Sequence, residues 1–556
     1  MRGAEILIDV LRDEGVDTIF GYPGGATLPL YDHLADSDMR HVLVRHEQCA
    51  AHMADGYARV TRRPAVCMAT SGAGATNLVT GIATAFLDSS PVIALTGQVP
   101  TAIIGNDAFQ EADIFSLMMP ITKHNFRVMD PRLLESDLRS AFKIAGTGRF
   151  GPVQVDLPRD VLNAEIERLP GNPTVRTNGI KRDLSRLPEA VRLLEEAERP
   201  LLVVGGGAVW CNCGQDVIEL AELTNSPVVT TLMGKGAVPE SHPLVLGMVG
   251  MHGRRVANLA IEECDILLAI GTRFSDRMIG DPSSCKPKVI HIDIDSGELG
   301  KNVQATIPLA GDARTVIREL ITAMVRRFNG SSWMDRMKVL KARCDCDFNL
   351  VDNPIKPQKV IHELNELLPD DAILTTEVGQ CQMWAAHFLR CDGDRRFITP
   401  GGLGTMGFGL PAAIGAKVAA PDRAVVDIAG DGSLMMVCQE IATAVEEDIP
   451  IFICLMNNQR LGMIMQLQSQ FYDGKLYAEQ LGAHPDFVKL AEAFGAVGVA
   501  VDDVSDLPSV IEEGIASDRP FLADIQIDPE EQILPMTLRG QDETKVITGN
   551  CTWKEV

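Results

Sequence analysis

Short apolar runs alternate with longer amphipathic stretches along most of the chain. HVLV is followed by EQCAAHMADGYARV, and PAVCMAT is followed by a glycine-rich turn and NLVTGIATAFLD. The short apolar and β-branched runs predict buried strands, and the stretches between them have the apolar spacing of helices. Because this alternation is typical of βαβ units, we predict an α/β fold of parallel sheets flanked by helices.

Two polar segments containing Pro and Gly divide this pattern into three blocks. At roughly 100–200 residues per domain, 556 residues suggest about three domains. The segment PGNPTVRTNGIKRD (170–183) and a second one around VDNPIKPQ have the composition of linkers. We therefore predict domains at 1–169, 185–345 and 359–528, followed by a polar C-terminal tail at 529–556 that forms a lid or an arm.

Composition places the chain among ordinary globular proteins, with 46 % hydrophobic and 23 % charged residues. The net charge of −24 disfavours nucleic acid and anionic membranes as partners, and an anionic substrate would need a local cationic pocket. The thirteen scattered cysteines favour reduced thiols of a cytoplasmic protein over a zinc site. The N-terminal stretch is typical of an amphipathic helix, and neither a signal peptide nor a membrane span is expected.

The strongest chemical signal is a pair of oxygen ligands in the third block. Asp431 follows the apolar run AVVDIAG, and Asn458 follows IFICLMN. The carboxyl ends of parallel strands meet at one edge of a sheet, so these side chains should lie together. Mg²⁺ prefers such oxygens, and the backbone carbonyl of Arg460 is a candidate third ligand. GDG alone would more often be a turn and NN a strand end, but together they favour a metal site.

The glycines around Asp431 suit a bound diphosphate. Gly430 and Gly432 would let the backbone approach the phosphates, and a helix beginning near Ser433 would favour an anion at its N-terminus. A GDG sequence followed by an Asn-rich strand end resembles the thiamine-diphosphate motif. It is this resemblance, rather than the spacing, that implies the identity of the cofactor.

Glu47 is the candidate acid for activating that cofactor. It lies between a predicted strand and a predicted helix in an apolar neighbourhood, where burial would raise the pKa of its carboxyl group. The pattern alone leaves open the alternative that Glu47 only stabilises the start of the helix through the helix dipole. In the thiamine-diphosphate enzymes that the motif resembles, this glutamate and the diphosphate site come from different subunits. The resemblance therefore implies catalysis by Glu47 in an obligate dimer or larger assembly.

A dozen ordered blocks resemble the acetohydroxyacid synthase (acetolactate synthase) catalytic-subunit family, from about residue 3 to about residue 528. They include GYPGG, RHEQCAAHMADGYAR, TSGAGATNLVTGIATAF, GTRFSDR, EVGQCQMWAA and GTMGFGLPAAIGA. The resemblance implies pyrimidine-binding, central and diphosphate-binding domains, with thiamine diphosphate, Mg²⁺ and FAD as cofactors. It implies that pyruvate is decarboxylated and its two-carbon unit is transferred to pyruvate or 2-oxobutanoate, in branched-chain amino-acid biosynthesis.

The resemblance also assigns roles to individual residues. Reaction-centre roles fall on Glu47, Gly25, Phe109, Gln110 and Arg277, and thiamine diphosphate contacts fall on Glu47, Val378, Gln380, Met406, Gly430, Gly432 and Ser433. FAD contacts fall on Arg149, Gly205, Gly206, Gly207, Met251, His252, Gly253, Gly271, Arg273, Asp293 and Asp312. The residues alone would not predict FAD, because GGGAVWCNCG does not fit GxGxxG and His252 by itself would more often be a core histidine.

The predicted acceptor pocket consists of Met251, Arg277 and Leu467. A guanidinium suits a substrate carboxylate because it can donate two hydrogen bonds, although the residues alone favour the alternative that Arg277 only pairs with Asp276. The family usually has a tryptophan at the position of Leu467, so we expect a weak preference for 2-oxobutanoate. The tail, LPMTLRGQDETKV, also departs from the family's usual Pro-Pro-Gly segment.

These departures leave alternatives open. The main one is a divergent thiamine-diphosphate carboligase or acyl transferase with another acceptor. A pyruvate-oxidase-like enzyme is less favoured because GTRFSDR and GMVGMHG resemble the synthase. A silent FAD-binding assembly protein is less favoured because Glu47, Asp431 and Asn458 are all present. The sequence does not decide between a homodimer and a homotetramer, or whether a regulatory small subunit binds.

Overall fold

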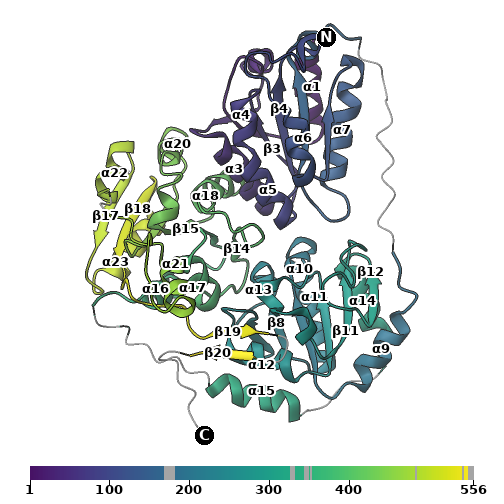
Figure 1. The fold of residues 1–556 in the computed structure, drawn as a ribbon, viewed down its shortest axis with the longest axis vertical. Coiled ribbons are helices and arrows are strands. Elements are labelled where there is room, and N and C mark those ends of the chain that lie inside the picture. Colours follow the sequence, from purple (N-terminus) through teal and green to yellow (C-terminus); the bar gives the residue numbers. More distant parts are fainter. Residues whose placement is uncertain are drawn as a thin grey trace.

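The computed structural model describes residues 1–167, 182–325, 332–343, 350, 353–482, 485–540 and 544–548. Within these residues the strands form three six-stranded parallel sheets and a two-stranded antiparallel sheet of β19 (Met536–Arg539) and β20 (Thr544–Ile547) (Figure 1). The predicted α/β fold with three parallel sheets is confirmed. The predicted linker at 170–183 lies almost wholly outside the described residues, as do the boundaries at 169 and 345, and the domain limits stay predictions.

The first sheet has the strand order β2-β1-β3-β4-β6-β5. Strands β3, β4 and β6 are buried along their whole length, as expected for parallel strands covered on both faces. The strands are β1 (Thr18–Gly21), β2 (Arg40–Leu43), β3 (Ala65–Ala69), β4 (Val92–Gln98), β5 (His124–Arg127) and β6 (Val153–Pro158). The helices are α1 (Gly3–Asp13), α2 (Leu28–Leu34), α3 (Glu47–Thr61), α4 (Ala73–Asn77), α5 (Val79–Asp88), α6 (Ile114–Met118), α7 (Leu134–Ala145) and α8 (Arg159–Asn163).

The central sheet has the order β12-β11-β10-β7-β8-β9. The order reverses between β7 and β10, and ligands of such sheets bind beyond the carboxyl ends of the strands at this point. The strands are β7 (Pro200–Val204), β8 (Val228–Thr230), β9 (Val245–Met248), β10 (Ile266–Ile270), β11 (Lys288–Asp293) and β12 (Ile307–Ala310). The helices are α9 (Leu187–Glu196), α10 (Gly206–Cys211), α11 (Gly214–Thr224), α12 (Arg255–Glu263), α13 (Asp276–Ile279), α14 (Ala313–Ala323) and α15 (Ser332–Arg343).

The third sheet has the order β14-β13-β15-β16-β18-β17, so that β15 and β16 are neighbours. The strands are β13 (Ile373–Thr376), β14 (Arg396–Ile398), β15 (Val425–Gly430), β16 (Phe452–Asn457), β17 (Val497–Val501) and β18 (Phe521–Gln526). The helices are α16 (Pro357–Leu367), α17 (Gln380–Phe388), α18 (Gly409–Ala419), α19 (Asp431–Leu434), α20 (Glu440–Glu446), α21 (Gly462–Phe471), α22 (Phe487–Phe494) and α23 (Leu507–Ala516).

Helix α3 of the first domain packs directly against α18 of the third (Figure 1). A Cβ atom on Gly56 would lie 2.2 Å from the carbonyl oxygen of Ala412, and one on Gly415 would lie 1.9 Å from that of Met53. Only glycine permits so close an approach of the two helices. Buried residues of both domains also join one hydrophobic cluster, which fixes the first domain against the third.

The C-terminal tail crosses from the third domain to the central one (Figure 1). The backbone N–H of Thr537 donates to the carbonyl oxygen of Met251 at 2.7 Å, and Nη2 of Arg539 donates to Oδ1 of Asn258 at 2.7 Å. Thr537 is 4 % exposed and Arg539 is 9 % exposed. The described part of the tail therefore contains a strand docked on the central domain, and its action as a lid or an arm stays a prediction.

No helix among the described residues is long and apolar enough to cross a membrane. The cysteines of the described ranges are all free thiols, in line with their scattered spacing.

Candidate active site

Asp431 and Asn458 follow adjacent strands of the third sheet. Strands β15 and β16 are paired with Gly430 opposite Met456, so Asp431 and Asn458, one and two residues further on, lie at the same edge. Asp431 is 2 % exposed and Asn458 is 7 % exposed. Burial raises the pKa of Asp431 to about 7, against the opposing effect of backbone hydrogen bonds. The structure brings together the carboxylate and the amide that the sequence paired.

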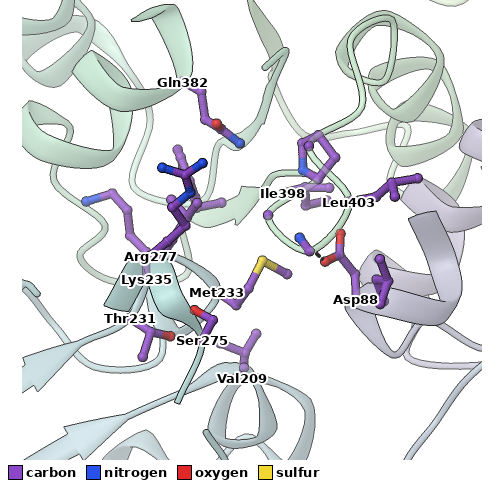
Figure 2. A pocket seen from close by; sticks show the side chains of 18 of the residues that line it. Asp88, Val209, Thr231, Met233, Lys235, Ser275, Arg277, Gln382, Ile398 and Leu403 are labelled. Carbon is purple, nitrogen blue, oxygen red and sulfur yellow. Dashed lines mark hydrogen bonds between the residues drawn. The ribbon is translucent and has the colours of Figure 1, made fainter. Parts of the chain in front are cut away.

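A cavity of about 1290 Å³ begins at this edge and extends between the domains (Figure 2). It exceeds the roughly 300–1,000 Å³ usual for one small ligand, so it can hold more than one group. Figure 2 shows Lys235 and Arg277 of the central domain, Gln382 and Leu403 of the third and Asp88 of the first around it. The predicted site residues that line it are Arg149, Gly206, Gly207, Met251, His252, Gly271, Arg273, Arg277, Asp293, Asp312, Val378, Gln380, Met406, Gly430, Asp431, Gly432, Ser433, Asn458, Arg460 and Leu467.

The surroundings of Asp431 fit a divalent cation bound with a diphosphate. Helix α19 begins at Asp431, two residues before the predicted start, and its first three residues line the cavity. A Cβ atom on Gly432 would lie 2.9 Å from Cδ2 of Leu461, so glycine keeps the backbone open there. Among the described residues no three His, Cys, Asp or Glu side chains cluster as a metal site. A cation here would therefore use one carboxylate, an amide, a carbonyl and ligand oxygens, a set that suits Mg²⁺.

A buried glutamate fixes the loop that carries Met406. Oε2 of Glu377 accepts hydrogen bonds from the backbone N–H groups of Gly407 (2.8 Å) and Phe408 (2.9 Å). Glu377 is fully buried, and burial raises its pKa. It directly precedes Val378, so it ties together two segments predicted to contact thiamine diphosphate. The EVGQ motif does not reveal this anchoring role, because the partners of Glu377 are backbone groups about 30 positions away.

In the central domain the cavity ends beside two glycine-rich strand ends. Gly207 follows β7 and Gly271 follows β10, and a Cβ atom on Gly207 would lie 2.8 Å from Cα of Gly271. Gly271 has a φ of +57°, which also favours glycine. Gly205 and Gly253 do not line the cavity, although both were predicted to contact FAD. A Cβ atom on Gly205 would lie 2.3 Å from the carbonyl oxygen of Gly271, so this glycine serves loop packing.

Several ionisable groups at this end of the cavity have a hydrogen-bond or ion-pair partner or a shifted pKa. Nη1 of Arg149 lies 2.8 Å from Oε1 of Glu298. Asp312 caps α14 by accepting from the backbone N–H of Thr315 at 2.9 Å. Burial raises the pKa of Asp293 to about 6, and burial together with the charge of Arg277 lowers the pKa of His252 to about 4. His252 is therefore neutral at pH 7.

Arg277 presents a cation at the same cavity. Its Nη1 lies 3.4 Å from the sulfur of Met251, and its Nε lies 3.7 Å from Oδ2 of Asp276. The pairing with Asp276 therefore exists, but the two side chains are 70 % and 81 % exposed, and such pairs contribute only about 0–1 kcal/mol. A substrate carboxylate can replace Asp276 at little cost. Leu467 of α21 lines the cavity as well.

The predicted reaction-centre residues of the first domain lie elsewhere. Glu47, Gly25, Phe109 and Gln110 do not line the cavity that contains Asp431. Glu47 is the first residue of α3, and its Oε2 accepts from Nδ2 of Asn77 at 2.9 Å. Its side chain is partly exposed in the single chain, so this chain alone does not provide the enclosure that the sequence predicted. Phe109 is 88 % exposed.

Three family profiles match the chain in order. "Thiamine pyrophosphate enzyme, N-terminal TPP binding domain" matches residues 1–117, the "central domain" of the same enzymes matches 187–320, and the "C-terminal TPP binding domain" matches 377–525. The third match contains both Asp431 and Asn458, and the first contains Glu47.

Curated relatives are similar over nearly the full length. The chain is 50 % identical to the "Probable acetolactate synthase large subunit" of Methanocaldococcus jannaschii, over 98 % of this chain and 95 % of that protein. It is 46 % identical to the "Acetolactate synthase" of Mycobacterium bovis, over 99 % and 92 % of the two chains. It is 42 % identical to the "Acetolactate synthase isozyme 3 large subunit" of Escherichia coli, over 97 % of each.

Proposed function

This chain belongs to the acetolactate synthase large-subunit family of thiamine pyrophosphate enzymes, and we propose that it joins the two-carbon unit of pyruvate to a second 2-oxo acid. With pyruvate as acceptor the product is 2-acetolactate, and with 2-oxobutanoate it is 2-aceto-2-hydroxybutanoate. Both products lead to branched-chain amino acids. One observation carries the proposal: a single cavity is lined by the possible metal ligands Asp431 and Asn458 and by the cationic side chain of Arg277.

We propose that Asp431, Asn458 and the backbone carbonyl of Arg460 hold Mg²⁺, which would bind the diphosphate of thiamine diphosphate. The buried carboxylate and the glycine at 432 support this assignment. When bound, the cofactor supplies an electron sink for the loss of carbon dioxide from a 2-oxo acid. The residues proposed to contact it in this chain are Val378, Gln380, Met406, Gly430, Gly432 and Ser433.

The central end of the cavity is proposed to bind FAD without using its redox chemistry. The close glycines at 207 and 271 and the position of this end beyond β7 and β10 support a dinucleotide. The residues proposed to contact FAD are Arg149, Gly206, Gly207, Met251, His252, Gly271, Arg273, Asp293 and Asp312. Gly205 and Gly253, which do not line the cavity, stay predicted FAD contacts.

Arg277 is proposed to bind the carboxylate of the acceptor, with Met251 and Leu467 forming the wall beside it. The loose ion pair of Arg277 with Asp276 supports this role, because little free energy is lost when that pair opens. It also answers the requirement for a local cation in a chain with a net charge of −24.

We infer that a second copy of the chain completes each active site. Glu47, Gly25 and Gln110 lie outside the cavity of their own chain, and large apolar side chains of the same domain are exposed. These exposed side chains include Tyr22, Leu28, Phe109, Leu117 and Met119 of the first domain. A homodimer or homotetramer would bury them. Because relatives are named large subunits, a regulatory small subunit is a further proposed partner, and the free thiols support a cytoplasmic location.

The proposal is tested by product analysis with the full chain. We expect pyruvate and 2-oxobutanoate, with thiamine diphosphate, Mg²⁺ and FAD, to yield 2-acetolactate and 2-aceto-2-hydroxybutanoate, both identified by mass spectrometry. Omitting thiamine diphosphate should abolish both products and the release of carbon dioxide. Carbon dioxide release without either product would instead support a carboligase with another acceptor, and no release at all would support a silent assembly protein.

Replacing Leu467 with tryptophan should shift the choice of acceptor toward 2-oxobutanoate. A flat aromatic wall would contact the extra methylene group, and discrimination of one methylene group is worth roughly 10-fold or more in rate. We expect the ratio of 2-aceto-2-hydroxybutanoate to 2-acetolactate to rise by about 10-fold when both acceptors compete. Gln468→Trp is the control, because the neighbouring position does not line the cavity. A wild-type enzyme that already strongly favours 2-oxobutanoate would contradict the prediction.

A further inference from the structure

A chain of side-chain amides leads away from the proposed metal ligand Asn458. Nδ2 of Asn458 donates to Oε1 of Gln380 at 3.4 Å, and Nε2 of Gln380 donates to Oε1 of Gln466 at 3.0 Å. The fold keeps space for this contact, because a Cβ atom on Gly462 would lie 2.1 Å from Oε1 of Gln380 and 2.6 Å from Nδ2 of Asn458. The glycine at the start of α21 therefore lets the first two amides meet.

The chain of amides ends on the backbone of the C-terminal tail. Gln466, on α21, is fully buried. Its Oε1 accepts from the backbone N–H of Ile533 at 2.9 Å, and its Nε2 donates to the carbonyl oxygen of the same residue at 3.0 Å. Nε2 of Gln380 also donates to the carbonyl oxygen of Glu531 at 3.2 Å. This tail segment lies just before β19, the strand that docks on the central domain.

The backbone of Ile533 orients Gln466 and, through it, Gln380, while Oδ1 of Asn458 also accepts from the backbone N–H of Arg460 at 3.2 Å. An amide side chain has nearly the same shape after a half turn, so its hydrogen-bond partners decide which end is oxygen. The fixed N–H and C=O of Ile533 orient Gln466, whose Oε1 then requires the NH₂ group of Gln380. Oε1 of Gln380 then faces Asn458 and accepts from the NH₂ group of the Asn458 side chain. The oxygen of Asn458, the end that can bind a cation, is thereby kept free of that contact.

We propose that Gln466 is a positioning residue that orients the carboxamide of Asn458 for the metal and couples metal binding to docking of the C-terminal tail. The proposal rests on the metal and diphosphate site proposed above. Because coupling is reciprocal, a docked tail strengthens metal binding, and bound metal strengthens docking of residues 531–540 to the same degree.

The test measures the Kd of Mg²⁺ by calorimetry in the full chain saturated with thiamine diphosphate. Gln466→Met removes the hydrogen bonds of the Gln466 side chain and keeps nearly the same side-chain length. Because Gln466 is proposed to support a metal ligand, its loss should raise the Kd for Mg²⁺ about 10- to 100-fold. Gln470→Met is the matched control: one turn along the same helix, Gln470 contacts the tail through Gln532 at 2.8 Å but contacts none of the three amides. Its Kd should stay within about two-fold of wild type.

Hydrogen exchange measured by mass spectrometry tests the coupling without activity. Adding Mg²⁺ and thiamine diphosphate should slow exchange in peptides covering 531–540 in the wild type and in Gln470→Met, but not in Gln466→Met. A wild-type Kd in Gln466→Met, or equal protection of the tail in all three proteins, overturns the inference. Absence of binding by the wild type overturns the proposed metal site and the inference with it.

Gln466→Glu keeps the test decisive if the methionine variant folds poorly. A protonated carboxyl group can donate to the carbonyl oxygen of Ile533 as the amide does, whereas an ionised one cannot. The ratio of the variant's Kd for Mg²⁺ to the wild-type Kd should therefore rise with pH as the introduced carboxyl group ionises. A ratio that stays constant with pH contradicts the coupling of metal binding to docking of the tail, because an ionised carboxylate still accepts from Gln380 and loses only the contact with the carbonyl oxygen of Ile533.

Discussion

Replacing Glu47 with glutamine should lower the turnover number by about 10²–10⁴-fold while thiamine diphosphate still binds. The carboxyl group can hold or release a proton at Oε1, and a carboxamide of the same shape cannot. Asn77 already occupies Oε2 at 2.9 Å. A Cβ atom on Gly74 would lie 3.1 Å from Oε1, so the glycine leaves that oxygen open. The measurement is steady-state formation of 2-acetolactate, with cofactor binding followed by calorimetry.

Glu5→Gln is the control for the competing structural role of Glu47. Glu5 also lies in the first turn of a first-domain helix, where its Oε2 accepts from the backbone N–H of Arg2 at 2.8 Å. If Glu47 only stabilised the start of α3, the two substitutions would each cost stability of about 0.3–1 kcal/mol and leave turnover nearly unchanged. That result would contradict catalysis by Glu47.

Mixing two inactive variants tests whether Glu47 acts across a subunit boundary. In a symmetric dimer formed by random pairing of Glu47→Gln and Asp431→Asn chains, half of the dimers are mixed, and each mixed dimer has one intact site. Mixing by unfolding and refolding should therefore restore about a quarter of the wild-type activity. If both residues served one site in the same chain, no activity would return.

Asp431→Asn should weaken Mg²⁺ binding by at least about 10- to 100-fold. This is the loss typical of residues that only support a metal ligand, and loss of a ligand itself should cost no less. The substitution keeps the size of the side chain but removes the negative charge that faces the cation. Turnover should fall with it and recover partly at high Mg²⁺ concentration. Asp156→Asn is the control, because Asp156 lies on β6 of the first sheet, is fully buried and does not line the cavity. Unchanged affinity in Asp431→Asn, measured by calorimetry, would refute the assignment.

The sequence predicts this fold well wherever strands are buried on both faces. AVVDIAG and IFICLMN contain β15 and β16 because parallel strands between two helical layers need continuous apolar runs. The tail is different. LPMTLRG contains β19, but its partners, Met251 and Asn258, lie in another domain, and no local pattern announces a contact at that distance. For a short, partly polar strand of this kind, the sequence therefore predicts a lid or an arm but not the domain on which it docks.

The candidate site likewise contains residues that the sequence could predict and residues that it could not. Asp431 and Asn458 could be paired from the sequence because each follows a predicted strand, and adjacent parallel strands end at one edge. Glu377 and Gln466 could not, because their partners are backbone groups of Gly407 and Ile533, which become neighbours only in the folded chain. Periodicity describes which face a residue occupies, but not which distant N–H group it meets.

The docking of β19 also has a consequence for the order in which the molecule is made. The side chain of Asn258 donates a hydrogen bond to Oγ1 of Thr537, which lies 279 residues later in the sequence. During synthesis from the N-terminus, the central sheet can form early, but Met251 and Asn258 must wait for these partners until the third domain has left the ribosome. Contacts so distant in sequence form late because a long loop must close first. The wall of the proposed acceptor pocket is therefore among the last parts of the protein to be completed, and an interrupted chain would lack it.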